Sequence, residues 1–408
     1  MLIEFTVGNY LSFKEKKTFS LESTAIKEHP ENVIDAGKYK LLRSAVIYGA
    51  NSSGKSNLIK AFKFMNEIVV NSAKGSSTEE IKVQPFLLSI DTEQQPSYFE
   101  IIFLIEGIRY RYGFEADKKI VHSEWLFECK ANKENQLFIR EKDAIEVMND
   151  FEEGKGLEIK TRDNALFLSV ADQFNGTTSK KIINWFNNQV VFSGIQHESK
   201  RVLTSSLLSD SGNYLPSLVR DFLNSLYLGF NDIRLIKTEK GTESIVTEHN
   251  KYDELGNVIG KCDFQLLEQE SSGTNKLYDI AGYLIYGLEL GRLTIIDELD
   301  AKLHPLLTMA IIRLFNSSEY NKHNAQLIIA THDTNLLSYG FFRRDQIYFT
   351  EKNRFEATDL YSLVEYREPD GTKVRNDRSY EKDYIAGRYG AIPFFGDFSK
   401  LVNDGEGS

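Results

Sequence analysis

The stretch SAVIYGANSSGKS, from Ser44 to Ser56, decides the fold of this 408-residue chain. Its first five residues form a short apolar run, which is typical of a buried strand. GANSSGKS then matches the pattern G-x-x-x-x-G-K-[ST], and the residues from about Lys55 to Val70 are expected to form a helix. A strand, a glycine-containing loop and a helix in this order predict a loop whose backbone N–H groups surround a phosphate group.

The residue types in this loop suit the triphosphate of ATP. Gly49 and Gly54 let the backbone curl, so that successive N–H groups point inward and the start of the helix adds its partial positive charge. Lys55 is expected to reach the β- and γ-phosphates, and the Ser56 hydroxyl to bind Mg²⁺. The predicted ATP-binding residues of the loop are Gly49, Ala50, Asn51, Ser52, Ser53, Gly54, Lys55, Ser56 and Asn57.

A second motif, LTIIDELD from Leu293 to Asp300, places two adjacent carboxylates at the end of a predicted strand. Ligands of open α/β sheets bind at the carboxyl ends of the strands. Asp297 is therefore expected to hold Mg²⁺ through its water shell, and Glu298 to act as the general base on the attacking water. A strand that ends in two acids is common, and this assignment depends on the phosphate loop upstream.

A third motif follows the predicted strand QLIIA, residues 326 to 330, which ends in Thr331 and His332. A strand, a helix at about 305 to 316 and a second strand form a βαβ unit with parallel pairing. His332 should then lie at the same sheet edge as the acids, within reach of the γ-phosphate and the water. A lone histidine at a strand end is more often structural.

The segment ESSGTNKLYDIAG precedes these motifs and predicts a capped helix from about Thr274 to Leu290. The plain interpretation is a core helix. The sharper one is a second anion site at its start, formed by Ser271, Ser272 and Gly273. If this start cannot reach the nucleotide of its own chain, it must reach that of a second copy, and twofold symmetry predicts a homodimer with two shared sites.

The composition of the chain limits the classes of protein to which it can belong. The formal net charge of −10 argues against a protein that coats nucleic acid through bulk electrostatics, although it leaves room for a local basic groove. The chain lacks an apolar run of 18 residues and begins without a basic region followed by an apolar block, so no membrane span or signal peptide is expected. Cys129 and Cys262 lie far apart in the sequence, so they indicate neither a zinc site nor a disulfide framework. This use of cysteine fits a protein of the reducing cytoplasm.

The expected organisation has three parts. Residues 1 to 130 should hold the phosphate loop and an antiparallel β-subdomain, residues 131 to 235 a mainly helical inserted lobe, and residues 236 to 408 the remaining motifs. Heptads do not persist, so a long coiled-coil arm is not expected. Arg343 and Arg344 are assigned by default to a surface turn, and the aromatic segment from Tyr384 to Phe398 to packing against the lobe.

These motifs, in this order, resemble the ABC-type ATPase heads of the SMC, RecF and overcoming-lysogenization-defect proteins. GANSSGKSNL, ESSGTNKLYDIAG, DELDAKLHPLL, RRDQIYFTEKN and YIAGRYGAIPF are most similar to stand-alone bacterial ATPases of the RloA or abortive-infection type, which include the ATPase of the PARIS anti-phage system. The likeness covers nearly the whole chain. It implies an α/β P-loop head with a mixed central sheet.

The resemblance also implies residue roles. Ser271 and Gly273 would engage the γ-phosphate held by the partner, Asp300 would belong to the dimer-contacting loop, and Gln84 in VQPF would be the Mg²⁺-contacting glutamine, although QPF also suits a strand-edge turn. Glu270, Ser272 and Thr274 depart from the signature of transporter heads. This puts the signature contacts in doubt.

The expected function is an ATP-gated switch that controls a separate effector, nuclease-like in the related proteins, during anti-phage defence. Only residues 333 to 408 follow the histidine, and they hold no separate acidic metal cluster that would indicate a nuclease within the chain. A DNA-repair ATPase that binds DNA in the RecF manner is the first alternative. A transporter's nucleotide-binding subunit and a scaffold that retains nucleotide without turnover are the others.

Overall fold

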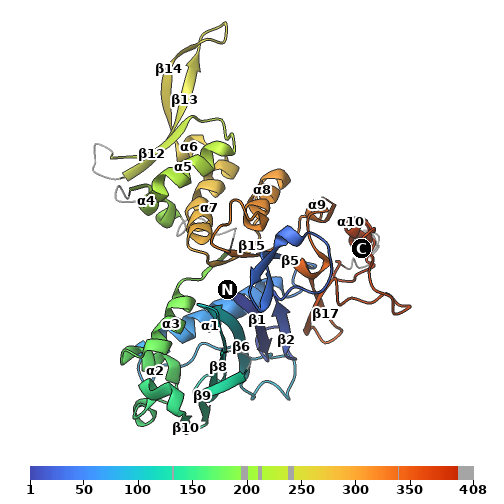
Figure 1. The fold of residues 1–408 in the computed structure, drawn as a ribbon. Coiled ribbons are helices and arrows are strands. Elements are labelled where there is room, and N and C mark those ends of the chain that lie inside the picture. Colours follow the sequence, from blue (N-terminus) through green and yellow to red (C-terminus); the bar gives the residue numbers. More distant parts are fainter. Residues whose placement is uncertain (131–132, 194–200, 210–213, 238–242, 339, 394–408) are drawn as a thin grey trace, which may run out of the picture.

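The centre of the molecule is a six-stranded sheet (Figure 1). The computed structural model describes residues 1–130, 133–193, 201–209, 214–237, 243–338 and 340–393. Five strands run parallel and the last is antiparallel, so the sheet is mixed, as expected. In spatial order the strands are β11 (Val190–Ser193), β15 (Leu293–Asp297), β16 (Gln326–Ala330), β5 (Ser44–Tyr48), β17 (Ile347–Lys352) and β18 (Thr358–Ser362).

The three central strands are buried on both faces, which explains their unbroken apolar sequences. One face packs against a core shared with α1 (Lys55–Asn71), and the other against a core shared with α7 (Ser272–Glu289) and α8 (Pro305–Asn316). Neighbouring residues alternate between the two cores, because successive side chains of a strand point to opposite faces. Ile47 lies in the first core and Val46 in the second.

A seven-stranded antiparallel sheet covers the far side of α1. Phe62 of α1 stacks on Phe5 of this sheet, with ring centroids 3.8 Å apart. In spatial order the strands are β10 (Ala144–Val147), β9 (Lys133–Glu141), β8 (Val121–Lys130), β7 (Ile108–Ala116), β6 (Ser97–Ile105), β1 (Leu2–Gly8) and β2 (Lys17–Ser20). A small hairpin, β3 (Val33–Ala36) and β4 (Tyr39–Leu42), lies before β5.

The secondary structure differs from the expectation of a mainly helical segment at 131–235. Residues 133–147 form β9 and β10, which extend the antiparallel sheet, and β11 pairs with β15 in the central sheet. Among the described residues of this segment, the α-helices form two pairs, α2 (Phe167–Gln173) with α3 (Thr177–Asn187), and α4 (Arg201–Ser209) with α5 (Leu215–Ser225). The strands at 133–147 went unrecognised because they carry few strongly apolar residues on their exposed face. The three-part division itself stays a prediction.

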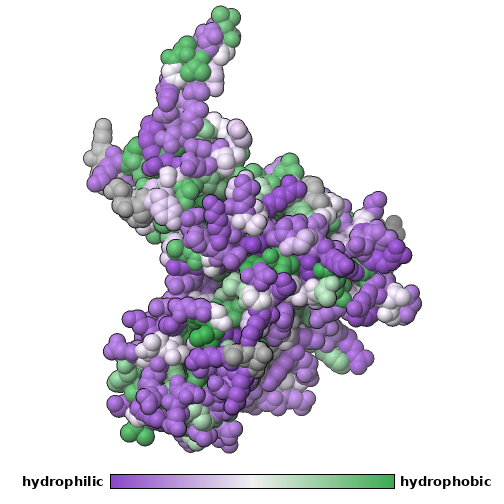
Figure 2. All heavy atoms as spheres, in the orientation of Figure 1, coloured by the Kyte–Doolittle hydropathy of each residue, from purple (hydrophilic) through white to green (hydrophobic). Residues whose placement is uncertain are grey.

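A three-stranded sheet projects from the helices at the top of Figure 1. It consists of β12 (Asp232–Lys237), β13 (Glu243–Tyr252) and β14 (Val258–Gln265), and α6 (Leu266–Gln269) joins it to α7. The far end of its hairpin carries apolar side chains that are visible on the surface (Figure 2). These exposed residues are Tyr252, Leu255, Val258 and Ile259.

The segment after β16 differs from its default assignments. Arg343 is only 2% exposed, and its guanidinium binds Asp345 and the carbonyl oxygens of Thr24, Ile26 and Glu28. It therefore lies in the interior and not in a surface turn, whereas Arg344 is paired with Glu28. Along the chain, α9 (Asn335–Ser338) and then the two arginines precede β17.

The described part of the aromatic segment, residues 384–393, packs on the central sheet and not, as expected, against the lobe at residues 131–235. Tyr384 of α10 (Tyr380–Ile385) contacts the rings of Tyr48 in β5 and Phe349 in β17, and Tyr389 contacts Phe349 as well. Residues 394 to 398 of the segment lie outside the described residues. Within the part of the chain that the structure describes, no helix has the length and apolarity needed to cross a membrane.

Candidate functional site

Strand register brings three of the predicted motifs to one sheet edge. Asp297 at the end of β15 pairs with Ala330 of β16, and Ala330 pairs with Ile47 of β5. Glu298, His332 and the loop that begins at Gly49 therefore follow neighbouring parallel strands at the same end. They border one cleft of about 420 Å³, whose lining consists of Asn51, Ser52, Ser53, Gly54, Lys55, Ser56, Asn57, Glu298, His332 and Lys352.

The two glycines of the loop are required by close packing. A Cβ atom on Gly49 would stand 2.5 Å from the carbonyl oxygen of Thr350, and one on Gly54 would collide with the Thr358 side chain. Gly54 also has a φ of 117°, a region that favours glycine. The loop is thus pressed against β17 and β18.

Lys55 lies almost fully buried at the start of α1. Its ammonium donates to the carbonyl oxygens of Gly49 at 2.7 Å and Ala50 at 3.1 Å. Burial lowers the pKa of Lys55 to about 8, and the carboxylates of Asp297, Glu298 and Asp300 oppose that shift. This buried cation needs anionic partners, and phosphate oxygens would supply them.

The donor set at the strand end fits Mg²⁺. Asp297 is buried, and its Oδ1 atom has no hydrogen-bond partner among the described residues. An unpaired buried carboxylate oxygen is costly, and a hard divalent cation is the partner that offsets the cost. Ser56, half-buried across the cleft, is the second predicted ligand.

The surroundings of Glu298 and His332 shift their pKa values in opposite directions, and the catalytic roles of both residues stay predictions. Burial raises the pKa of Glu298, and the neighbouring Asp297 and Asp300 raise it further. Burial lowers the pKa of His332, and the Lys55 ammonium lowers it too, so the imidazole is neutral at pH 7. Glu298 also has a φ of 55°, which is unusual for a glutamate and marks a constrained backbone.

The predicted second anion site forms the start of α7. Ser271 is the N-cap, and its Oγ atom accepts a hydrogen bond from the Thr274 N–H at 3.1 Å. Ser271 and Ser272 are exposed. In the described chain, Ser271, Ser272 and Gly273 line no part of the cleft around Lys55. Asp297 is absent from this lining as well, although it directly precedes Glu298.

Gln84 is placed outside the cleft lining as well. It is exposed, and its backbone carbonyl accepts a hydrogen bond from the Leu11 N–H at 2.9 Å. This contact belongs to the turn that follows β1. Its assignment as a Mg²⁺ ligand stays a prediction.

Sequence reasoning missed the residues that support the loop from behind. The Thr350 hydroxyl lies 2.6 Å from that of Ser53, and Thr358 contacts both the Ser53 carbonyl oxygen and the Ser12 hydroxyl. The Asn57 amide donates to the same Ser12 hydroxyl at 2.8 Å. Threonines in strands are too common to signal such a role.

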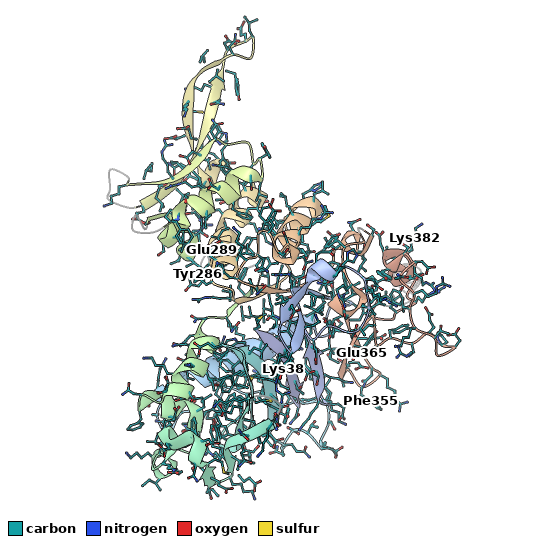
Figure 3. All side chains as sticks on the ribbon, viewed as in Figure 1. Lys38, Tyr286, Glu289, Phe355, Glu365 and Lys382 are labelled. Carbon is teal, nitrogen blue, oxygen red and sulfur yellow. The ribbon has the colours of Figure 1, made fainter. Side chains whose placement is uncertain are left out.

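Lys352, at the end of β17, is the cleft residue for which the sequence predicted no role. Its ammonium is 3.2 Å from the Glu356 carboxylate in the turn before β18, and the same turn exposes Phe355 at the edge of the molecule (Figure 3). A lysine near a strand end has no sequence pattern of its own. Its place in the cleft comes from the pairing of β17 with β5.

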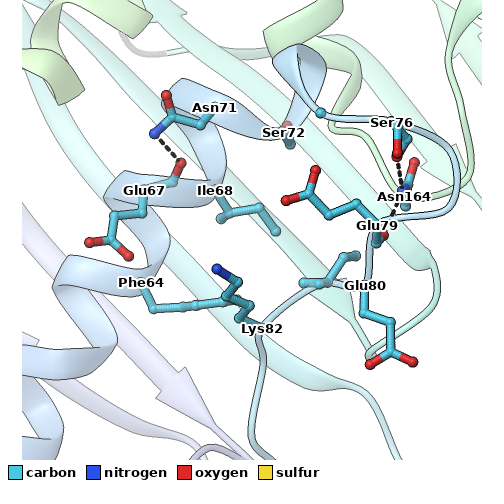
Figure 4. Close-up of a pocket in the computed structure, with 12 residues that line it drawn as sticks. Phe64, Glu67, Ile68, Asn71, Ser72, Ser76, Glu79, Glu80, Lys82 and Asn164 are labelled. Atoms are coloured by element: carbon cyan, nitrogen blue, oxygen red, sulfur yellow. Dashed lines mark hydrogen bonds between the residues drawn. The ribbon is translucent and has the colours of Figure 1, made fainter.

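A second cleft of about 350 Å³ lies along the end of α1 and has different chemistry (Figure 4). Figure 4 shows the Glu79 carboxylate and the Lys82 ammonium directed into it. Glu67 and Glu80 also line it, so carboxylates outnumber the lysine. Like charges repel phosphate, and this cleft is therefore not a nucleotide site.

Phosphate groups suit the first cleft, and this places the chain in the class of P-loop nucleotide-binding proteins. Within that class its family is shown by sequence. Residues 44–338 match the family described as AAA domain, putative AbiEii toxin, type IV TA system, and the chain belongs to this family. The match includes the phosphate loop, the start of α7, the acid pair and His332. No curated protein matches the chain.

Solved structures of SMC head domains are among those similar to the chain. One is a crystal structure of an SMC head bound to the C-terminal winged-helix domain of ScpA, 15% identical, with a TM-score of 0.43, covering 88% of this chain and 97% of that chain. Another is the SMC head domain from Thermotoga maritima, 14% identical, with a TM-score of 0.41, covering 88% of this chain and 98% of that chain.

Proposed function

We propose that the chain binds and hydrolyses Mg·ATP, that ATP closes a head-to-tail homodimer, and that this closure switches a separate effector protein. One observation carries the proposal. Lys55, Glu298 and His332 line one cleft, whereas the described start of α7, with its exposed serines, lines none of it. A second copy would complete the site, because a helix start is an anion-binding element.

The residues of the cleft would divide the chemistry as follows. Lys55 exchanges the carbonyl oxygens of Gly49 and Ala50 for phosphate oxygens. Glu298 accepts a proton from the attacking water. The water oxygen forms a bond to the γ-phosphorus, and the bond between the γ-phosphorus and the bridging oxygen of the β-phosphate breaks, which yields ADP and phosphate. Neutral His332 donates to the γ-phosphate. Mg²⁺, held by Ser56 and Asp297, would neutralise phosphate charge.

The dimer test uses Glu298→Gln to slow turnover. Light scattering should show a monomer without nucleotide and a dimer with Mg·ATP, because γ-phosphate contacts exist only in the closed state. Lys55→Ala should stay monomeric under both conditions. The same result is expected for Gly273→Asp, which places a carboxylate where the γ-phosphate would bind. A dimer whose stability is independent of ATP would contradict the switch.

The proposed role in anti-phage defence has two supports. The family description names a putative toxin of a toxin–antitoxin system, which favours a second component. The projecting hairpin ends in the apolar side chains of Tyr252, Leu255, Val258 and Ile259, and a cluster of this kind marks a surface for a protein partner. We propose that the effector contacts this tip.

Co-purification with the products of adjacent genes, with and without ATP, tests the partner. Leu255→Asp should abolish capture, and Ile159→Asp is its matched control, because the two side chains are 87% and 91% exposed on different parts of the chain. Capture of an effector by both variants alike would rule out the hairpin tip. Salt-sensitive, ATP-dependent DNA binding without any protein partner would favour a DNA-repair function instead.

A further inference from the structure

Lys276, in the second turn of α7, is 1% exposed and holds the loop that follows the acid pair. Its ammonium donates to the carbonyl oxygens of Glu298 at 3.0 Å, Leu299 at 2.8 Å and Ala301 at 2.6 Å. An ammonium has three N–H groups, which matches these three acceptors. A buried lysine is costly unless its charge is satisfied, so α7 and this loop are firmly tied.

The loop in question includes the proposed general base. The Glu298 backbone, in its left-handed conformation, is held from two sides. Its N–H donates to the Ala330 carbonyl oxygen at 2.9 Å, and its own carbonyl oxygen accepts from Lys276. A backbone in this region persists only where its surroundings impose it. Lys276 therefore helps to set the direction of the Glu298 side chain.

The same helix begins at the predicted second anion site. Gly273 and Lys276 are three residues apart, which is less than one helical turn. Gly273 also lies against the loop after the acids, since a Cβ atom on it would stand 3.2 Å from the Lys302 carbonyl oxygen. The start of α7 and the Glu298 loop are thus joined by direct contacts at both Gly273 and Lys276.

We propose that Lys276 is a positioning residue that couples the two ATP sites of the dimer, an inference that rests on the function proposed above. In a head-to-tail dimer, the α7 start of one chain contacts the γ-phosphate bound by its partner. The Lys276 of that same chain holds the Glu298 that acts on the chain's own nucleotide. Each site is then fully active only when the other is filled.

The first test compares Lys276→Met, which keeps the apolar stem but loses the donors, with Lys276→Arg, which keeps donors. For Lys276→Met we expect unchanged affinity of the monomer for a fluorescent ATP analogue, turnover lower by roughly 10- to 100-fold, and a Hill coefficient near 1 instead of about 2. Lys276→Arg should stay close to wild type. A Lys276→Met protein with wild-type turnover and cooperativity overturns the proposal.

The second test needs no change at position 276 and so holds even if Lys276→Met fails to fold. Differently tagged Gly273→Asp and Lys55→Ala chains are mixed, and the hybrid dimer is isolated through both tags. One of its sites combines the wild-type Lys55 and Glu298 of one chain with the wild-type α7 start of the other. Coupling predicts turnover there far below half the wild-type rate per dimer, because the α7 start of the hydrolysing chain is not engaged.

Turnover of that single site at half the wild-type rate per dimer would overturn the coupling. Failure of the underlying function has a different signature. Wild-type protein would then hydrolyse no ATP, or Glu298→Gln would form no ATP-dependent dimer. The two failures are therefore distinguishable within one set of measurements.

Discussion

Thr358 and Ser53 are 305 residues apart in the chain and are joined by a hydrogen bond of 2.9 Å from the threonine hydroxyl to the serine carbonyl oxygen. This bond fixes the middle of the phosphate loop to β18. Thr350 of β17 contacts the hydroxyl of the same serine. The shape of the loop therefore depends on two strands that lie far from it in the sequence.

Replacement of Thr358 by valine should weaken the loop. The variant leaves the buried Ser53 carbonyl oxygen without its donor, which should lower the free energy of unfolding by about 1 to 3 kcal/mol and weaken ATP binding. Urea unfolding and nucleotide titration measure the two effects. Thr372→Val is the control, because that exposed threonine bonds only to nearby Asp370 and should change stability by less than about 0.5 kcal/mol.

The two lysines of the cleft should contribute unequally to ATP affinity. Lys55→Met removes a buried cation and should weaken binding by roughly 100-fold or more, since charge-assisted bonds to phosphate are strong. Lys352→Met should cost only about five-fold, because this half-exposed ammonium already pairs with Glu356. Equilibrium binding of labelled ATP decides the order. Equal losses would show that Lys352 binds phosphate as directly as Lys55.

Substitutions of the two acids should have different effects, one on ATP turnover and the other on Mg²⁺-dependent ATP binding. Glu298→Gln removes a proton acceptor and should reduce kcat by about 10² to 10⁴ while ATP still binds. Asp297→Asn removes a ligand charge and should weaken the Mg²⁺ dependence of binding itself. Titrations of ATP at varied Mg²⁺ and single-turnover assays measure these effects. Normal turnover by Glu298→Gln would move the general base to another residue.

Arg343 should be a major determinant of stability. Arg343→Met leaves Asp345 buried without its counter-ion and releases three backbone carbonyl oxygens, so we expect a loss of about 3 to 5 kcal/mol in the free energy of unfolding. Arg375→Met is the control, because this arginine pairs with Asp377 at 77% exposure and should cost less than about 1 kcal/mol. Denaturant titration should show this contrast directly.

The local motifs predicted the strand and the helix that flank the phosphate loop because their geometry is set by short stretches of chain, whereas the roles of the site residues stay predictions. GANSSGKS needs only a strand before it and a helix after it, and the structure has β5 and α1 at those positions. His332 and Asp297 could be placed at one edge because parallel strands end together. Their placement follows from the order of strands and helices in the sequence and does not depend on how side chains pack.

The contacts that were missed are all distant in sequence. Lys276 meets a loop more than 20 residues away, Arg343 reaches residues 24 to 28, and Thr358 reaches Ser53. Single residues of common types leave no pattern when their partners lie so far along the chain. The strands at 133–147 were missed for a different reason, since β9 depends on pairing with β8 and β10 on pairing with β9.

The family match ends at residue 338, yet β17 and β18 begin at Ile347 and Thr358. The portion of sequence that identifies the family is thus shorter than the portion that gives the phosphate loop its rear wall. A fragment cut at the family boundary would keep the phosphate loop, the acid pair and His332 and still lose the strands behind Gly49 and Gly54. A protein fragment whose boundaries come from sequence similarity alone would therefore lack the strands that pack behind its phosphate loop.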